Sequence, residues 1–475
     1  MKKILLFLIA FIVLSGCKKD KKTTPETPEV TVTTFTIPVE AATLNPSGNA
    51  PLSALLKFTS PISGHTEIVV TGKHGEPSDV AQTFTDNGTT HSIPIIGLYS
   101  DYLNTVKISV VDAQGNRANS TVTIQTGPLP VNTPTYIKVD FSDIPNMEPG
   151  LNLVSSFSGN APPQTPFIMD SYGDIRWYLD FTANEELKGL YYDCGVARLH
   201  NGNFYFGNNR GTNKIYEVDI LGKVVKSWAM GNYIFHHNVT EKANGNFLVS
   251  VSSPLSTHPN GSPTTEDYII EIDRTSGEII TTWDLKESLD ETRTETPNLE
   301  DWIHVNAVIP DTSDNTIIVS GRTQGLIKLT YDNKVKWILS PHYGFGKNRR
   351  GEDLNQYLLQ PLDAGGNAIT DYGIVSGFKN HTDFEWNWYQ HSPVLMPNGD
   401  VLMFDNGTSR NFDTSLPKYS RAVEYKINPT NMTVQQVWQY GKERGLETFS
   451  GVVSSVKYLP EKNHILFSPG LRVIN

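Results

Sequence analysis

The chain has 475 residues and a formal net charge of −11, with 38% hydrophobic residues, 19% charged residues, 37 glycines and 29 prolines. This length is too great for one small domain, and the many turn-forming residues favour a mostly β structure. The acidic balance argues against a nucleic-acid-binding surface, which needs a basic face.

The N-terminus has the pattern of a secretory signal. Lys2 and Lys3 precede an apolar run, Ile4–Leu14, that is too short to span a bilayer comfortably. The run ends in Leu14-Ser15-Gly16-Cys17, which resembles a bacterial lipobox. The resemblance implies cleavage before Cys17 and lipidation of this cysteine, so residues 1–16 are predicted to be a lipoprotein signal peptide.

Residues 17–30 are predicted to be a polar tether, because they hold too little apolar content to fold. Loss of the two signal lysines takes the net charge from −11 to −13. We expect a periplasmic, membrane-anchored lipoprotein, and the absence of Asp after Cys17 favours the outer membrane. Cys194 would be the one thiol left, which excludes a disulfide within the mature chain.

Residues 31–127 are predicted to form a β-sandwich of immunoglobulin-like type. Asn87-Gly88 and Gln114-Gly115-Asn116 are turn signals between short runs rich in β-branched residues. The strand candidates are Thr31–Val39, Ala54–Phe58, Glu67–Thr71, Val80–Thr85, Thr90–Ile96, Thr105–Val111 and Ser120–Thr126. Gly127-Pro128-Leu129-Pro130 marks the expected boundary with a second domain, residues 128–475.

This second domain repeats internally. Each unit has an Asn-Gly turn or its equivalent, then strands, the last of which ends in tryptophan. The copies run over residues 201–228, 244–283, 314–337 and 398–438. An insertion, Ser340–Glu385, lengthens the interval between the third copy and the last. A period of about fifty residues with several strands per unit predicts a β-propeller.

The ends of the repeat leave ring closure open. A half-unit, Phe167–Trp177, precedes the first copy, and a final unit begins at Tyr458–Phe467 and stops at Asn475. The final unit could pair with Phe167–Trp177 and close a ring of five blades. Alternatively, the ring has a further blade that is incomplete in this sequence.

Three units begin with histidine. The stretches are His236-His237-Asn238, Asp301-Trp302-Ile303-His304-Val305-Asn306 and Asn387-Trp388-Tyr389-Gln390-His391-Ser392. The innermost strands of a propeller line its axis, so these histidines are expected to converge. Strand alternation would put Tyr389, Asn387 and Glu385 on the face of His391, and Trp302 and Asn306 on the face of His304. Alternation does not choose between His236 and His237.

Arg322 follows the next strand of the His304 unit and is expected to join the histidines. A neutral imidazole can attack an electrophile, and Arg with two further His can hold a tetrahedral oxyanion such as sulfuryl or phosphoryl. The sequence has no P-loop, no GxGxxG after a strand and no GxSxG. A nucleotide donor is therefore not expected. Aromatic residues near His391 suit a flat apolar substrate.

Several stretches resemble bacterial arylsulfate sulfotransferases, enzymes that do not use nucleotide-activated sulfate. They are Trp302–Asn306, Ile317–Arg322, Gln390-His391-Ser392, Val401–Gly407 and Val434–Gly445. The resemblance implies a six-bladed propeller with an incomplete last blade here, and ping-pong transfer of a sulfuryl group from an aryl sulfate ester to a phenolic acceptor through a sulfohistidine.

Carried over to this sequence, the resemblance makes His391 the nucleophile, with His237, His304 and Arg322 holding the sulfuryl oxygens. It selects His237 over His236. Asn306, Tyr389 and Trp302 are further candidates for substrate binding. No cofactor is implied.

The alternative hypothesis is a lipid-anchored binding or scaffold propeller without catalysis. A third idea, a metal site of His237, His304 and His391, is disfavoured because these residues lack short ligand spacing. We therefore predict that the site binds no metal. The sequence does not determine the oligomeric state, and a homodimer is one option. If the pKa of His391 is the ordinary value of about 6.5, the first half-reaction should fall at acid pH and should not stay flat to about pH 5.

Overall fold

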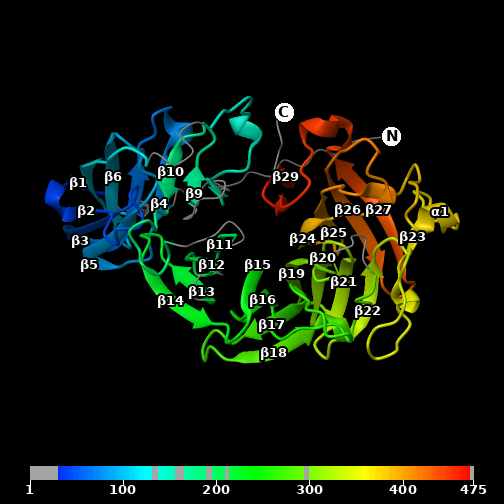
Figure 1. The fold of residues 1–475 in the computed structure, drawn as a ribbon. Coiled ribbons are helices and arrows are strands. Elements are labelled where there is room, and N and C mark those ends of the chain that lie inside the picture. The colour runs from blue at the N-terminus through cyan, green and yellow to red at the C-terminus, as the bar shows by residue number, and fades with distance from the viewer. Residues whose placement is uncertain are drawn as a thin grey trace, which may run out of the picture.

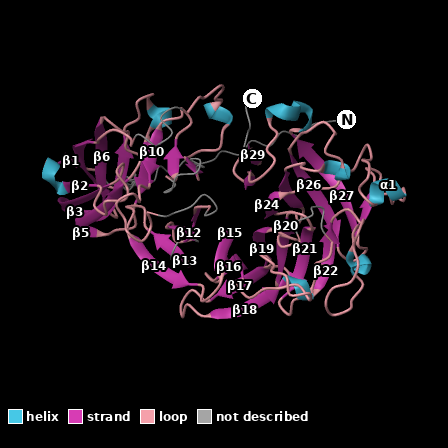
Figure 2. Ribbon diagram, viewed as in Figure 1, coloured by secondary structure: helices cyan, strands magenta, loops and turns pink. Residues whose placement is uncertain are grey.

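The computed structural model describes residues 30–130, 137–155, 165–188, 195–208, 213–293 and 299–470. The predicted signal peptide, the lipidation site Cys17 and the remaining thiol Cys194 lie outside the described residues. Strands dominate, and the helical segments are short and peripheral (Figure 2). None of the helices in the described ranges is long and apolar enough to cross a membrane.

The N-terminal domain is a β-sandwich whose layers share one long strand. Its strands are β1 (Val32–Thr34), β2 (Ala42–Leu44), β3 (Ala54–Val70), β4 (Val80–Thr83), β5 (Gly88–Ile95), β6 (Leu103–Val111) and β7 (Arg117–Gln125). The first part of β3 pairs with β2 and β5, and its second part pairs with β4 and β6. β1 adds to β7 in parallel. The boundary at residues 127–128 stays a prediction.

Two strands expected to be separate, Ala54–Phe58 and Glu67–Thr71, are one bent strand. The pairing register of β3 shifts between Thr59 and Gly64, where the strand passes from one layer to the other. A Cβ at Gly64 would lie 2.2 Å from the carbonyl oxygen of Val111, so only glycine permits this approach. The bend is an irregularity of the strand, of the kind that a bulge makes, and not a turn between two strands.

The second domain consists of blades arranged around an arc (Figure 1). The first sheet holds β8 (Asn152–Val154), β9 (Phe167–Met169) and β10 (Ile175–Tyr178). The second blade holds β11 (Ala197–Arg198), β12 (Phe204–Asn208), β13 (Lys214–Val218) and β14 (Val224–Ala229). The third holds β15 (Ile234–Glu241), β16 (Phe247–Ser252), β17 (Tyr268–Ile272) and β18 (Ile279–Asp284). The fourth holds β19 (Val305–Asp311), β20 (Thr316–Gly321), β21 (Gly325–Thr330) and β22 (Val335–Leu339).

The fifth blade carries the insertion. Its strands are β24 (His391–Leu395), β25 (Val401–Asp405), β26 (Arg421–Asn428) and β27 (Thr433–Tyr440), with β23 (Gln360–Leu362) added in parallel to β27. The insertion therefore extends the outer edge of this blade, together with the short helix α1 (Tyr372–Val375). Each predicted repeat copy supplies strands two to four of a blade, and the preceding segment supplies the innermost strand.

Repeated tryptophans join each blade to the next. The indole N–H of Trp177 donates to the carbonyl of Ile220, that of Trp228 to Arg274 and that of Trp283 to Thr330, at 2.8, 2.8 and 3.0 Å. Each acceptor lies at the turn between the last two strands of the following blade. The rings are buried in the apolar cores between blades.

The expectation of six blades is wrong for the described residues, which form five. After β27 the described part of the chain, up to residue 470, makes only a two-stranded hairpin, β28 (Ser455–Leu459) and β29 (His464–Ser468). Within the described residues, the alternative closure is not formed either, since β9 pairs with β8 and β10 and not with this hairpin. Instead, the backbone N–H of Lys462 donates to Glu148, 2.7 Å away, before β8. Trp438 of the fifth blade is accordingly 37% exposed.

We predict that Trp283→Ala lowers the free energy of unfolding by about 3–5 kcal/mol, because it empties a fully buried site and removes the indole donor. Trp438→Ala, the matched control at the equivalent place, should lower it by less than about 1 kcal/mol. Guanidinium unfolding of both variants measures the difference, and equal losses would contradict the role assigned to the inter-blade bond.

Candidate active site

The histidines of three blades lie close together on the inner side of the arc, at the innermost strands. His236 and His237 lie on β15, His304 immediately precedes β19, and His391 is the first residue of β24. Nε2 of His237 and Nε2 of His304 are 3.0 Å apart, and the ring centroids of His237 and His391 are 6.2 Å apart. The sequence prediction that these residues converge agrees with this geometry.

The backbone at these positions is not regular strand. His237 has φ 52°, His304 φ 51° and Tyr389 φ 56°, values in the left-handed region that non-glycine residues rarely adopt. The pairing register also shifts at the start of β15, β19 and β24. Bulges of this kind re-aim side chains, and they bring the imidazoles to one place at some cost in backbone strain.

Strand alternation therefore fails before His391. The predicted shared face with Asn387 and Glu385 does not exist, because β24 begins only at His391. The carboxylate of Glu385 turns instead to Arg421 and Lys442. Burial opposes its ionisation, but the positive charges of Arg421 and Arg410 and the hydrogen bond from Lys442 outweigh burial and lower the pKa of Glu385 to about 2.

Asn406 holds the ring of His391. Nδ1 of His391 lies 2.8 Å from Oδ1 of Asn406 and 3.0 Å from the carbonyl oxygen of Tyr389. The amide of Asn406 donates to the carbonyls of Ser450 and Val453, at 2.8 and 2.9 Å, which turns its Oδ1 toward the histidine. Two acceptors at Nδ1 place the proton on that nitrogen, so Nε2 carries the lone pair.

Burial keeps this imidazole neutral. His391 is almost fully buried, and its pKa is lowered to about 4, chiefly by desolvation. The positive charges of His304 and Arg322 also lower this pKa, whereas the hydrogen bond to Asn406 raises it by less than desolvation lowers it. The assumption of an ordinary pKa near 6.5 is therefore wrong, because it took no account of desolvation. A neutral nucleophilic nitrogen is present well below pH 6.

His304 has the opposite environment. Its Nδ1 lies 2.5 Å from Oε2 of Glu266 and 3.0 Å from both carboxylate oxygens of Asp301. Desolvation lowers its pKa, but the hydrogen bonds to Asp301 and Glu266 outweigh it and raise the pKa of His304 above the usual value. Desolvation and the neighbouring histidines lower the pKa of His237 well below its usual range. The pair therefore carries its proton on His304.

Arg322 supplies a permanent cation beside this pair. Its Nη1 is 3.2 Å from Nε2 of His304, and its Nη2 donates to Asp301 at 2.8 Å. The guanidinium carbon is 5.6 Å from the ring centroid of Tyr389. Arg322, His304 and the neutral Nε2 of His391 together suit a tetrahedral oxyanion that is attacked by nitrogen.

The three proposed substrate-binding residues have different places. Tyr389 lies in the site, beside Arg322. Asn306 donates to the carbonyl of Gln390 at 2.8 Å, so it ties the His304 blade to the residue before His391. Trp302 is not brought to the site: it is fully buried in the core, and its indole N–H donates to Asp267 at 3.2 Å. This hydrogen bond holds the residue that follows Glu266 and so helps to position the Glu266 loop.

Three contributors were missed from the sequence: Glu266, Asp301 and Asn406. Asp301 and Asn406 stand in stretches that were already singled out, DWIHVN and VLMFDNG. A carboxylate three residues before a histidine and an amide after a strand were available signals. Glu266 has no such signal, because its approach to His304 depends on how two blades pack.

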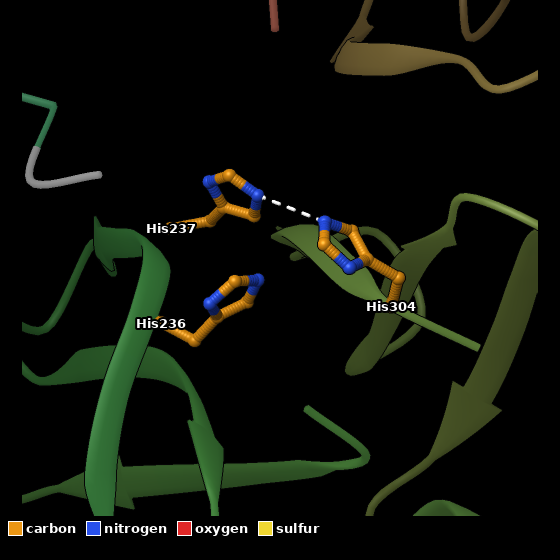
Figure 3. A group of neighbouring side chains, drawn as sticks. All are labelled: His236, His237 and His304. Carbon is orange, nitrogen blue, oxygen red and sulfur yellow. Dashed lines mark hydrogen bonds between the residues drawn. The ribbon is translucent and has the colours of Figure 1, made fainter. Parts of the chain in front are cut away.

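The ring nitrogens of His236, His237 and His304 lie within 4.8 Å of one another, a spacing that could hold a metal ion (Figure 3). Glu266 and Asp301 form a second such group with His304. Glu266 and Asp301 contact Nδ1 of His304, so they do not themselves compete for its Nε2. The guanidinium of Arg322, however, would repel a cation there. The residues favour an anion over a metal.

Buried charges behind the site hold the segment before His391. Arg421 donates to the carbonyls of Glu385 and Trp386, and its Nε lies 2.8 Å from Asp405. Asp405 also accepts from the backbone N–H of Trp388 at 2.9 Å. Removing one partner from such a network leaves an uncompensated buried charge, so loss of any one of these residues would destabilise the segment.

The chain matches the family model described as "Arylsulfotransferase (ASST)" over residues 138–475, and the "Arylsulfotransferase Ig-like domain" over residues 41–127. It is 30% identical to "Arylsulfate sulfotransferase AssT" of Lelliottia amnigena, over 90% of this chain and 84% of that protein. It is 29% identical to the protein of the same name from Escherichia coli O6:H1, over 89% and 83%.

Among solved structures, a putative 6-phosphogluconolactonase from Bacteroides uniformis aligns with a TM-score of 0.31 and 10% identity, over 79% of this chain and 96% of that one. A similarity at this level carries no argument. The family models, by contrast, cover most of the chain and include its immunoglobulin-like domain. The chain belongs to the arylsulfotransferase family of enzymes.

Proposed function

We propose that this enzyme transfers a sulfuryl group from an aryl sulfate ester to a phenolic acceptor by a ping-pong mechanism with a sulfohistidine at His391. One observation carries the proposal. Asn406 orients the neutral imidazole of His391, and the cationic groups of His304 and Arg322 lie in the same buried site. Family membership supports the aryl sulfate and the phenol as substrates.

In the first half-reaction, Nε2 of His391 forms a bond to sulfur while the ester S–O bond breaks. The electron pair of that bond leaves with the phenolate oxygen. In the second half-reaction, the oxygen of an acceptor phenol bonds to sulfur and the S–N bond breaks. That electron pair returns to Nε2, and the phenolic proton is released.

His304, Arg322 and His237 are proposed to hold the non-bridging sulfuryl oxygens. These donors are set in position by the blades before substrate arrives, so little reorganisation is needed at the moment of reaction. Asn306 and Tyr389 are proposed to complete the substrate site. Trp302 is not part of the substrate site, because its ring is fully buried in the core.

The cellular setting is proposed from the sequence alone. Lipidation at Cys17 would anchor the enzyme to the outer membrane on the periplasmic side, with residues 17–30 as the tether. A homodimer also stays a prediction.

The first test uses the full chain in detergent with p-nitrophenyl sulfate, with and without phenol, beside His391→Ala. We expect nitrophenolate release that depends on phenol, a stoichiometric burst without phenol, and neither in the variant. Release without transfer to phenol would contradict the ping-pong proposal. A folded wild-type protein that binds the ester but never releases nitrophenolate would favour a non-catalytic scaffold.

Arg322→Lys is expected to lower kcat/KM by on the order of a hundredfold, or about 3 kcal/mol, because Lys loses the planar fork that contacts Asp301 and faces the oxyanion. Steady-state kinetics with p-nitrophenyl sulfate measures this loss. Lys334→Arg, an exchange at an exposed turn, is the matched control. Near-normal turnover in Arg322→Lys would remove this residue from the site.

The acid limit of the burst rate is expected near pH 4. The folded-state pKa of His391 is lowered, so its neutral form persists as pH falls and is lost only as pH passes through about 4. Stopped-flow bursts between pH 3.5 and about 8 would measure this limit, with circular dichroism as a check on folding at each pH. A limit near the ordinary value of about 6.5 would show that His391 is not desolvated as described.

A further inference from the structure

We propose that Glu266 is a positioning residue that holds His304 as an imidazolium, and that His304 passes one proton to the leaving phenolate and takes one from the acceptor phenol. The inference rests on the proposed function and adds a proton path to it. Its starting point is a buried carboxylate that bridges two histidines of different blades.

Glu266 is placed by main-chain bonds as well as by its carboxylate. It has φ 58° just before β17, its N–H donates to Ser252 at 2.9 Å, and its carbonyl accepts from Val305, next to His304, at 3.0 Å. Its Oε2 lies 2.5 Å from Nδ1 of His304 and 2.9 Å from Nε2 of His236. The side chain is 18% exposed. Main-chain bonds to both blades fix this geometry.

The charges around His304 need this second carboxylate. The groups that face its ring are the carboxylates of Glu266 and Asp301, the guanidinium of Arg322, and the imidazoles of His236, His237 and His391. Arg322 already pairs with Asp301. Without Glu266, an imidazolium and a guanidinium would share one carboxylate in a buried site, and repulsion would favour loss of the proton.

The two ring nitrogens of His304 then have separate tasks. Nδ1 is held by Glu266 and Asp301, so the proton that can be transferred is the one on Nε2. Nε2 lies 3.0 Å from Nε2 of His237 and 3.2 Å from Nη1 of Arg322, the two groups that are proposed to hold the sulfuryl oxygens together with His304. The raised pKa of His304 and the lowered pKa of His237 agree with a proton that rests on His304.

The protons balance over both half-reactions. As the ester S–O bond breaks, Nε2–H of His304 gives its proton to the departing oxygen, and the phenol leaves neutral. His304 is then a neutral base. When the acceptor oxygen attacks sulfur, its proton returns to Nε2 of His304, and the S–N bond electrons return to His391. No other reactant is needed.

Leaving-group basicity separates a proton donor from a merely structural residue. Phenyl sulfate releases a basic phenolate that needs the proton, whereas p-nitrophenyl sulfate releases a stable phenolate that does not. We therefore expect Glu266→Gln to lower the burst rate with phenyl sulfate about 10- to 100-fold more than the rate with p-nitrophenyl sulfate. Glu266→Asp should restore part of the difference, and Glu300→Gln, at an exposed neighbouring position, should resemble wild type.

The pH profile gives a second readout. The imidazolium is lost as pH rises through the pKa of His304, so the burst with phenyl sulfate should fall on the alkaline side. Glu266→Gln removes a charge that raises this pKa, and the fall should move to lower pH. The p-nitrophenyl sulfate profile should fall much less on its alkaline side in both proteins, because its leaving group does not need the proton.

Equal losses with the two esters, or an unmoved alkaline limb in a folded Glu266→Gln protein, would overturn the inference. If that variant does not fold, the wild-type protein decides: alkaline profiles that coincide for the two esters would also overturn it. Failure of the proposed function is distinct, because wild-type protein would then give no burst with p-nitrophenyl sulfate at any pH.

Discussion

The site depends on keeping two neighbouring buried imidazoles, His391 and His304, in opposite protonation states. His391 must be neutral to attack, and His304 is most useful as a cation. Desolvation alone would make both neutral. The difference comes from their hydrogen-bond partners: an amide and a backbone carbonyl for His391, and two carboxylates for His304. Neutral acceptors fix a tautomer, whereas carboxylates stabilise a charge.

The propeller makes this asymmetry feasible because each partner comes from a different place in the chain. Asn406 belongs to the blade of His391, whereas Glu266 precedes a strand of the neighbouring β15–β18 blade. Inter-blade bonds, such as that from Trp283 to Thr330, keep neighbouring blades in a set orientation. A blade that shifted by one ångström would separate Glu266 from His304 and change the charge of the site without altering any catalytic residue.

The same geometry explains why an anion suits the site better than a metal. Three imidazoles in proximity are the ligands that zinc prefers. Here, however, the guanidinium of Arg322 lies 3.2 Å from Nε2 of His304, and its permanent positive charge would repel a bound cation.

The sequence by itself determined the all-β composition, the repeat, the convergence of three histidines and Arg322, and the family. The first three follow from local periodicity, which burial of alternate residues imposes on every blade, whereas the family followed from short motifs that resemble those of arylsulfate sulfotransferases. Tertiary structure alone decided the number of blades, because strand pairing at the ends of the arc is non-local. It also decided that Trp302 belongs to the core, that β24 starts at His391, and that His391 has a lowered pKa. Each depends on desolvation or on contacts between residues far apart in the chain, such as Glu266 with His304, which no local pattern encodes.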